Sequence, residues 1–134
     1  MMKVLLIDDN EDLTEAVCDF LDMSGIECKV VNNGRAGLEE ILNHKGTYSL
    51  ILLDIAMPEL SGFDVLERLK KEGGQNSSLL YEENIVIFTA SSVRDSVIQD
   101  YVDQGVKEVL KKPVSIEDLA QLIEKYKKPV DSQK

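Results

Sequence analysis

The sequence predicts an α/β fold: a doubly wound sheet of five parallel strands with helices on both faces. The first observation is that apolar runs of strand length alternate with amphipathic stretches of helix length along the chain. The second is that these runs are continuously apolar, as in strands buried on both faces, and that four of them end in polar residues. For the strand order we adopt 2-1-3-4-5, the order of flavodoxin-like folds built from the same right-handed units.

After the first apolar run, a helix is expected to begin beyond Asn10, a good N-cap residue, and to stop at Gly25. Its buried face follows the i, i+3, i+4, i+7, i+8 spacing of Leu13, Ala16, Val17, Phe20 and Leu21. A second strand over Glu27–Val31 is expected to precede a helix from about Arg35 to His44, with Gly46 as its C-cap.

The third strand is expected over Ser49–Asp54, and a helix over Gly62–Lys71 follows a turn. Three apolar side chains of that helix should face inward, namely Phe63, Leu66 and Leu69. Residues 72–84 include the polar run 73–78 and exceed the usual length of an α/β connection. They are therefore predicted to form a mobile loop, a tolerated insertion.

The fourth strand is expected over Ile85–Thr89, followed by a helix over about Ser92–Gln104. One face of that helix carries Val93, Val97 and Tyr101. The fifth strand is expected over Val106–Lys111. The last helix begins with Ser115 and Asp118, a variant of the capping box, and runs to about Lys127.

Length and composition fit one domain, since the chain has 134 residues of which 43% are apolar. We expect the domain to cover residues 1–128 and a flexible tail to cover 129–134. The net charge of -10 argues against direct binding of nucleic acid. No apolar stretch approaches the roughly 20 residues that cross a membrane, and no signal-peptide pattern is present, so a cytoplasmic location is expected.

The two cysteines, Cys18 and Cys28, fall in a predicted helix and a predicted strand. We expect both to be buried free thiols, consistent with a reducing cytosol. The single histidine, His44, lies at a predicted helix C-terminus, where it complements the helix dipole and needs no catalytic role.

Polar side chains stand where four of the predicted strands end. Asp8 and Asp9 follow the first strand, Asp54 ends the third, Thr89 ends the fourth, and Lys112 follows the fifth. The carboxyl ends of parallel strands meet at one edge of a sheet, where neighbouring strands are about 4.8 Å apart. We therefore expect one cleft with three carboxylates, a hydroxyl and an ammonium.

Three crowded carboxylates repel one another, and a divalent cation would offset that repulsion. A set of oxygen ligands without His or Cys suits Mg²⁺. An aspartate beside Mg²⁺ can attack phosphorus and form an acyl phosphate, whose three outer oxygens then need balancing charges or donors. The cation, Lys112, and the Thr89 hydroxyl with a backbone amide near Ala90 would each serve one of them.

Each of these residues also has an ordinary structural explanation. An aspartate after a strand commonly caps a turn, Thr89 alone suits a strand, and a lysine before proline can be an exposed side chain, as we expect of Lys111. Their joint occurrence at strand ends, in this order, favours a functional site.

Four segments resemble the motifs of two-component response-regulator receiver domains: Leu6–Asn10, Asp54–Gly62, Thr89–Ala90 and Lys112–Pro113. The resemblance extends from about Lys3 to Tyr126. It implies a stand-alone domain, similar to the chemotaxis receiver, that acts as a phosphoacceptor signalling switch and catalyses only its own phosphorylation and dephosphorylation. It also implies that the Lys112–Pro113 bond is often cis.

The resemblance implies a role for each site residue: Asp54 as phosphoacceptor, Asp8, Asp9, Asp54 and the Ala56 backbone carbonyl at Mg²⁺, Thr89 as switch hydroxyl, Ala90 beside the phosphoryl group, and Lys112 as phosphate partner. The donor would be a histidine kinase or a phosphotransfer protein. Output would pass through an unknown downstream protein. The surface involved would be that of the fourth expected helix (residues 92–104), the fifth strand (106–111) and the fifth expected helix (residues 115–127). We expect a monomer or weak dimer.

One position departs from the pattern, since the family usually has an aromatic residue three positions before the lysine, where this chain has Val109. In the family that ring swings inward as the hydroxyl equivalent to Thr89 moves to the phosphoryl group. A valine has little surface to swing and a stiff side chain. We therefore expect phosphorylation to survive and the readout to differ, through residues 90–104.

Three alternative functions differ from this one in the residues or the chemistry that they require. An aspartyl phosphatase of similar fold would need a second acid at Ala56, and a flavodoxin-type cofactor binder would need a Ser/Thr/Gly phosphate loop at Asp8–Asn10. A pseudo-receiver that serves only as a binding scaffold would differ in chemistry and not in motif.

Overall fold

The computed structural model describes residues 2–73, 79–90 and 94–127. In these ranges five strands form one parallel sheet in the order β2-β1-β3-β4-β5, which confirms the predicted fold class and strand order. The strands are β1 Lys3–Ile7, β2 Glu27–Val31, β3 Leu50–Asp54, β4 Ile85–Thr89 and β5 Glu108–Lys111.

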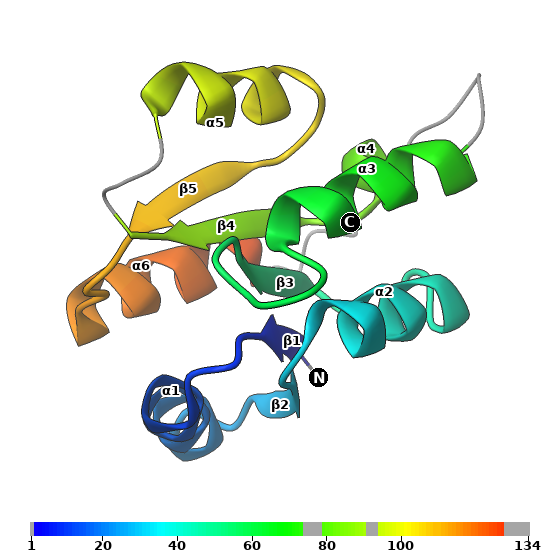
Figure 1. The fold of residues 1–134 in the computed structure, drawn as a ribbon. Coiled ribbons are helices and arrows are strands. Elements are labelled where there is room, and N and C mark those ends of the chain that lie inside the picture. The colour runs from blue at the N-terminus through cyan, green and yellow to red at the C-terminus, as the bar shows by residue number, and fades with distance from the viewer. Residues whose placement is uncertain (1, 74–78, 91–93, 128–134) are drawn as a thin grey trace.

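Helices cover both faces of this sheet (Figure 1). They are α1 Glu11–Met23, α2 Gly34–Asn43, α3 Gly62–Gly73, α4 Leu79–Glu82, α5 Asp95–Asp103 and α6 Ile116–Tyr126. α1 and α6 pack on one face, and α2, α3 and α5 pack on the other. None of the described helices is both long and apolar enough to cross a membrane.

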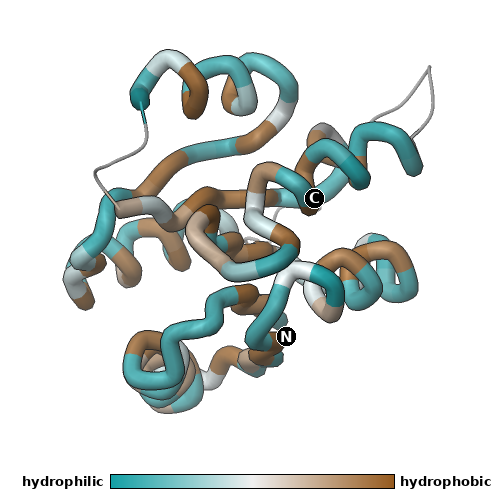
Figure 2. The backbone as a smooth tube through the Cα atoms, in the orientation of Figure 1, coloured by the Kyte–Doolittle hydropathy of each residue, from teal (hydrophilic) through white to brown (hydrophobic). Residues whose placement is uncertain are grey.

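Alternate strand residues point to opposite faces and build two apolar clusters. Leu5, Ile51 and Ile87 belong to the cluster under α2 and α3. Leu6 and Leu52 belong to the cluster under α1 and α6. The tube of Figure 2 is accordingly brown along the central strands and largely teal on the outer turns of the helices.

Side-chain caps set the helix starts that the sequence predicts. Asn10 Oδ1 accepts a hydrogen bond from the Leu13 N–H at 3.1 Å, and Ser115 Oγ accepts one from the Asp118 N–H at 3.0 Å. The predicted C-cap of α2 is wrong, because the helix ends at Asn43 and His44, not Gly46, is its C-cap residue. The side chains of Asn10 and Ser115 satisfy N–H groups that have no partner within their helices.

The prediction of a loop over residues 72–84 is wrong in part. α3 continues to Gly73, and α4 forms a further helical turn at Leu79–Glu82. The reason is burial, because Leu80 is fully buried in the core under α3. Glu83 is also buried, and its Oε2 accepts a hydrogen bond from the Gly46 N–H at 3.0 Å. Residues 74–78, the rest of the polar run, lie outside the described residues, as does the expected tail 129–134.

The prediction of buried free thiols is wrong. Cys18 and Cys28 form a disulfide, with Cα atoms 5.7 Å apart, and both residues are partly exposed. Cys28 packs against the apolar cluster under α1 and α6, and neither the helical nor the strand pattern alone indicates that α1 brings Cys18 to it.

Smaller differences concern helix faces and ends. Ala16, expected in the buried face of α1, is exposed. α5 begins at Asp95 and buries Ile98, while Val97 and Tyr101 are half-buried. Val93 lies outside the described residues. β5 begins two residues after Val106, which is itself buried.

Candidate functional site

Three carboxylates meet at the carboxyl ends of β1 and β3, as predicted. One carboxylate oxygen from each of Asp8, Asp9 and Asp54 lies within 4.8 Å of the others. Asp8 and Asp54 are only 1% and 2% exposed, whereas Asp9 is open to solvent. Two buried carboxylates and one exposed carboxylate form a set of hard oxygen ligands, so the residues present fit a hard divalent cation that keeps some of its waters.

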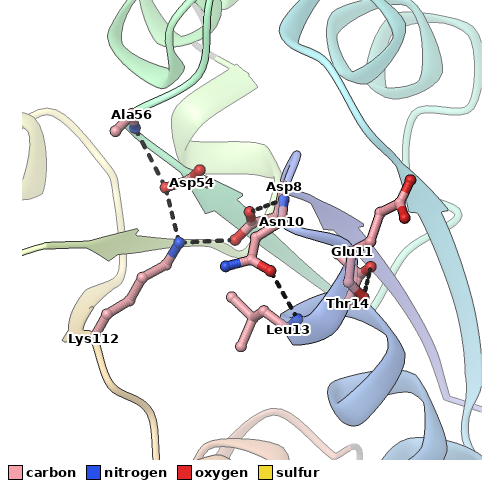
Figure 3. Close-up of polar contacts among 8 residues, drawn as sticks. All are labelled: Asp8, Asn10, Glu11, Leu13, Thr14, Asp54, Ala56 and Lys112. Carbon is pink, nitrogen blue, oxygen red and sulfur yellow. Dashed lines mark hydrogen bonds and ion pairs between the residues drawn. The ribbon is translucent and has the colours of Figure 1, made fainter.

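Lys112 joins the two buried carboxylates. Its Nζ lies 3.1 Å from Asp8 Oδ2 and 3.3 Å from Asp54 Oδ1 (Figure 3). Its backbone N–H donates to the Thr89 carbonyl at 2.8 Å, and the bond to Pro113 is cis. The ammonium therefore offsets part of the negative charge that the strand ends bring together.

Backbone donors orient the same carboxylates. Asp8 Oδ1 accepts from the Asn10 N–H at 2.9 Å, and Asp54 Oδ1 accepts from the Ala56 N–H at 3.3 Å. The other Asp54 oxygen, Oδ2, accepts no hydrogen bond from any described residue. Asp54 is thus held through one oxygen and leaves the other available for a ligand or a reaction.

The electrostatics of the site raise the pKa of Asp54 to about 6. Burial is the larger cause and the neighbouring Asp8 carboxylate the next, while Lys112 and the Ala56 N–H act in the opposite direction. Burial alone would lower the pKa of Lys112, but Asp8 and Asp54 outweigh it and raise that pKa above its usual value. At pH 7 Asp54 is therefore mostly ionised and Lys112 is charged.

Thr89 lies at the predicted strand end, yet its hydroxyl does not contact the carboxylates. The side chain is 1% exposed, and Oγ1 donates to the Ala90 carbonyl oxygen at 2.8 Å. Ala56 and Ala90 are both exposed beside the site. For Thr89 to reach a group on Asp54, its hydroxyl must exchange the bond to Ala90 for a new one.

Gly62 lets α3 begin directly against the end of β3. A Cβ at this position would lie 2.4 Å from the Asp54 carbonyl oxygen and 2.8 Å from Ile55 Cα. The Gly62 N–H donates to the Ile55 carbonyl at 3.0 Å. The sequence indicates this glycine only as a helix start, because the close approach arises from the tertiary fold.

The sequence did not predict that an aromatic ring of α3 stacks on one of α5. The rings of Phe63 and Tyr101 stack with centroids 5.1 Å apart, and the Tyr101 hydroxyl donates to Glu67 Oε2 at 2.7 Å. Val109 is half-buried, and it packs with Phe63 and Tyr101 against the apolar cluster under α2 and α3. Tyr101 and Val109 therefore pack against one apolar cluster, from α5 and β5 respectively, and the aromatic group is on α5.

The geometry described above is that of a receiver domain, and comparison with known proteins agrees. The chain belongs to the response regulator receiver domain family, whose model matches residues 4–124. The transcriptional regulatory protein CiaR of Streptococcus pneumoniae is 34% identical over 124 residues, which cover 92% of this chain and 50% of that protein. The aerobic respiration control sensor protein ArcB of Escherichia coli K12 is 31% identical over 125 residues, which cover 93% of this chain and 15% of that protein. The chain thus spans half or less of the length of these relatives.

Solved structures show the same fold. A response regulator receiver domain protein from Clostridium thermocellum has a TM-score of 0.77 and 26% identity, over 94% of both chains. The chemotaxis protein CheY4 of Vibrio cholerae has a TM-score of 0.76 and 22% identity, over 94% of this chain and 98% of that one.

Proposed function

We propose that this chain is a phosphorylation-controlled switch in which Asp54 accepts a phosphoryl group from a phosphohistidine donor, a histidine kinase or a phosphotransfer protein. One observation carries the proposal. The buried Asp54 carboxylate is oriented by Lys112 and Ala56 through Oδ1, while Oδ2 has no hydrogen-bond partner among the described residues.

In the transfer step Asp54 Oδ2 attacks phosphorus and forms a new O–P bond. The P–N bond to the donor imidazole breaks, and its electron pair stays on the imidazole nitrogen. Because the pKa of Asp54 is about 6, the carboxylate is ionised at pH 7 and needs no general base. Lys112 balances negative charge on the transferred group, and Thr89 serves as the switch hydroxyl once it leaves Ala90.

Asp8, Asp9 and Asp54 would hold Mg²⁺, with the Ala56 backbone carbonyl as a further ligand. When bound, Mg²⁺ supplies positive charge that offsets the carboxylates and the transferred group. The ammonium of Lys112 contacts Asp8 Oδ2 and Asp54 Oδ1, so this ion pair and the cation compete for the same oxygens.

We infer that phosphorylation changes the surface of α5, β5 and α6 and thereby the affinity for a downstream protein. Its first step is the movement of Thr89 at the end of β4, the strand whose Ile87 pairs with Val109 of β5. The proposal includes a receiver domain over residues 1–128 that is monomeric or weakly dimeric, acts in the cytoplasm, and catalyses its own phosphorylation and dephosphorylation.

Phosphotransfer from a histidine-phosphorylated protein tests this proposal. With a radiolabelled donor and Mg²⁺, label should appear on the wild type and on Asp95→Asn, a control acid exposed on α5, and not on Asp54→Asn. Equal labelling of Asp54→Asn would place the phosphoryl group elsewhere and refute the assignment.

A further inference from the structure

The disulfide lies outside the site that the proposed function uses. It joins Cys18 in α1 to Cys28 in β2, the strand at one edge of the sheet. Both cysteine residues are partly exposed, at the edge of the sheet. These are the only two cysteines of the chain, which makes the pair a complete dithiol.

Both ends of this disulfide lead to Asp8. From Cys18, α1 runs back to its cap at Asn10, whose N–H donates to Asp8 Oδ1 at 2.9 Å. From Cys28, β2 runs forward to Val31, whose carbonyl accepts from the Asp8 N–H at 3.1 Å. The disulfide, α1, Asp8 and β2 thus form a closed loop of covalent and hydrogen bonds, with Asp8 on the opposite side from the disulfide. Figure 1 shows α1 beside β2 below the end of β1.

Apolar contacts hold α1 on the sheet in addition to the disulfide. Val17 and Leu21 of this helix are buried in the cluster under α1 and α6. Disulfides in a reducing compartment are mostly transient or redox-sensing, and accessible ones exchange most readily. A partly exposed bond at an edge strand, beside a helix that apolar contacts also hold, fits such a reversible role.

We propose that Cys18 and Cys28 are a redox modification site, oxidised by low-molecular-weight disulfides, whose state tunes cation binding at Asp8. A thiolate of the pair attacks the small disulfide, forms a mixed disulfide and releases one small thiol. The second thiolate then attacks the protein sulfur of the mixed disulfide and releases the second small thiol. Two protein thiols are oxidised, one small disulfide is reduced, and the two protons pass to the released thiols.

Oxidation limits the movement of α1 relative to β2 and so fixes both hydrogen bonds of Asp8. A metal-ligating side chain that is already held in place loses less freedom when it binds the ion. The oxidised form should therefore bind Mg²⁺ about 2–5-fold more tightly than the reduced form. The expected difference in Mg²⁺ affinity rests on the metal assignment of the proposed function, whereas formation of the disulfide does not.

The oxidation itself is tested by equilibration in glutathione buffers of varied redox ratio, followed by alkylation and intact mass. The wild type should lose two hydrogens as the buffer becomes oxidising and regain them under reduction. Cys18→Ser and Cys28→Ser should instead acquire one mixed disulfide with glutathione. Two thiols that remain alkylatable at every ratio, or a bond that no ratio reduces, would overturn the proposal.

The coupling is tested by Mg²⁺ titration of both forms in calorimetry, with the Cys18→Ser/Cys28→Ser double variant as control. The oxidised wild type should bind Mg²⁺ about 2–5-fold more tightly and melt about 5–10 °C higher than the reduced protein. The double variant should match the reduced form with or without reductant. Equal Mg²⁺ affinity of the two wild-type forms would overturn the coupling, and neither readout depends on phosphorylation of Asp54.

Discussion

Lys112 Nζ lies 3.3 Å from Asp54 Oδ1, although 58 residues separate the two in the chain. β4 lies between β3, which ends in Asp54, and β5, which ends one residue before Lys112, so the lysine reaches across the end of β4 to the carboxylate. The contact couples the charge of Asp54 to that of Lys112. Stability, cation binding and phosphoryl transfer should therefore respond together to changes at this pair.

Replacing the buried Asp54 carboxylate by a neutral amide should stabilise the metal-free protein. Folding raises the pKa of Asp54 from its ordinary 3.8 to about 6, so between these values the folded protein keeps a proton that the unfolded chain has lost. The free energy of unfolding therefore falls as pH rises through this window and stays lower above it. In urea unfolding with a chelator, Asp54→Asn should be about 1–3 kcal/mol more stable than the wild type at pH 7.5. That advantage should vanish near pH 4, and an advantage that does not change with pH would contradict the account.

Removing the ammonium of Lys112 should have two opposite effects. Lys112→Met leaves the buried carboxylates of Asp8 and Asp54 without their cation and should lower metal-free stability by about 1–3 kcal/mol at pH 7.5. It should also raise Mg²⁺ affinity several-fold, because the competing ammonium is gone. Lys111→Met is the matched control, since that lysine is exposed and pairs with the exposed Asp95. Weaker Mg²⁺ binding by Lys112→Met would show that the lysine does not compete with the cation.

Adding a methyl group at Gly62 should distort the strand end that carries Asp54. The new Cβ would lie 2.4 Å from the Asp54 carbonyl oxygen, a backbone atom that cannot turn away. Gly62→Ala should therefore cost about 2–4 kcal/mol in chemical unfolding. Gly46→Ala provides the comparison, because its φ of 78° adds backbone strain while no atom lies within 4 Å of the new Cβ. It should cost about 1 kcal/mol, and equal losses at both positions would argue against the close approach.

An aromatic residue at Val109 should change the readout of phosphorylation and not the reaction. Val109→Tyr should be phosphorylated at a rate within about twofold of the wild type, because Val109 packs against the apolar cluster and not among the site residues. Hydrogen exchange of α5 on phosphorylation should differ between the two proteins. Val30→Tyr, on the exposed edge strand β2, should behave as the wild type. An identical exchange response in Val109→Tyr would leave the altered readout without support.

Most of the fold could be predicted from the sequence because the strands are buried on both faces. The limits of β2 and β4 agree residue for residue with the predicted Glu27–Val31 and Ile85–Thr89. α4 could not be predicted, because its burial of Leu80 depends on a surface formed by distant elements. The bond between Cys18 and Cys28 depends likewise on how α1 and β2 meet.

The candidate site was partly predictable from the positions of its residues at strand ends. Strand ends in a parallel sheet share an edge, so the proximity of Asp8, Asp9 and Asp54 followed from their positions after apolar runs. The hydrogen bond from Thr89 to Ala90 did not, because side-chain rotation at a strand end is set by local donors and acceptors.

The most direct measurement is the intact mass of the protein after incubation with acetyl phosphate, with and without Mg²⁺, for the wild type and Asp54→Asn. The account predicts one labile phosphoryl group on the wild type, only with Mg²⁺, and none on the variant. No adduct on a wild-type protein that still binds Mg²⁺ would contradict the account and indicate a binding scaffold.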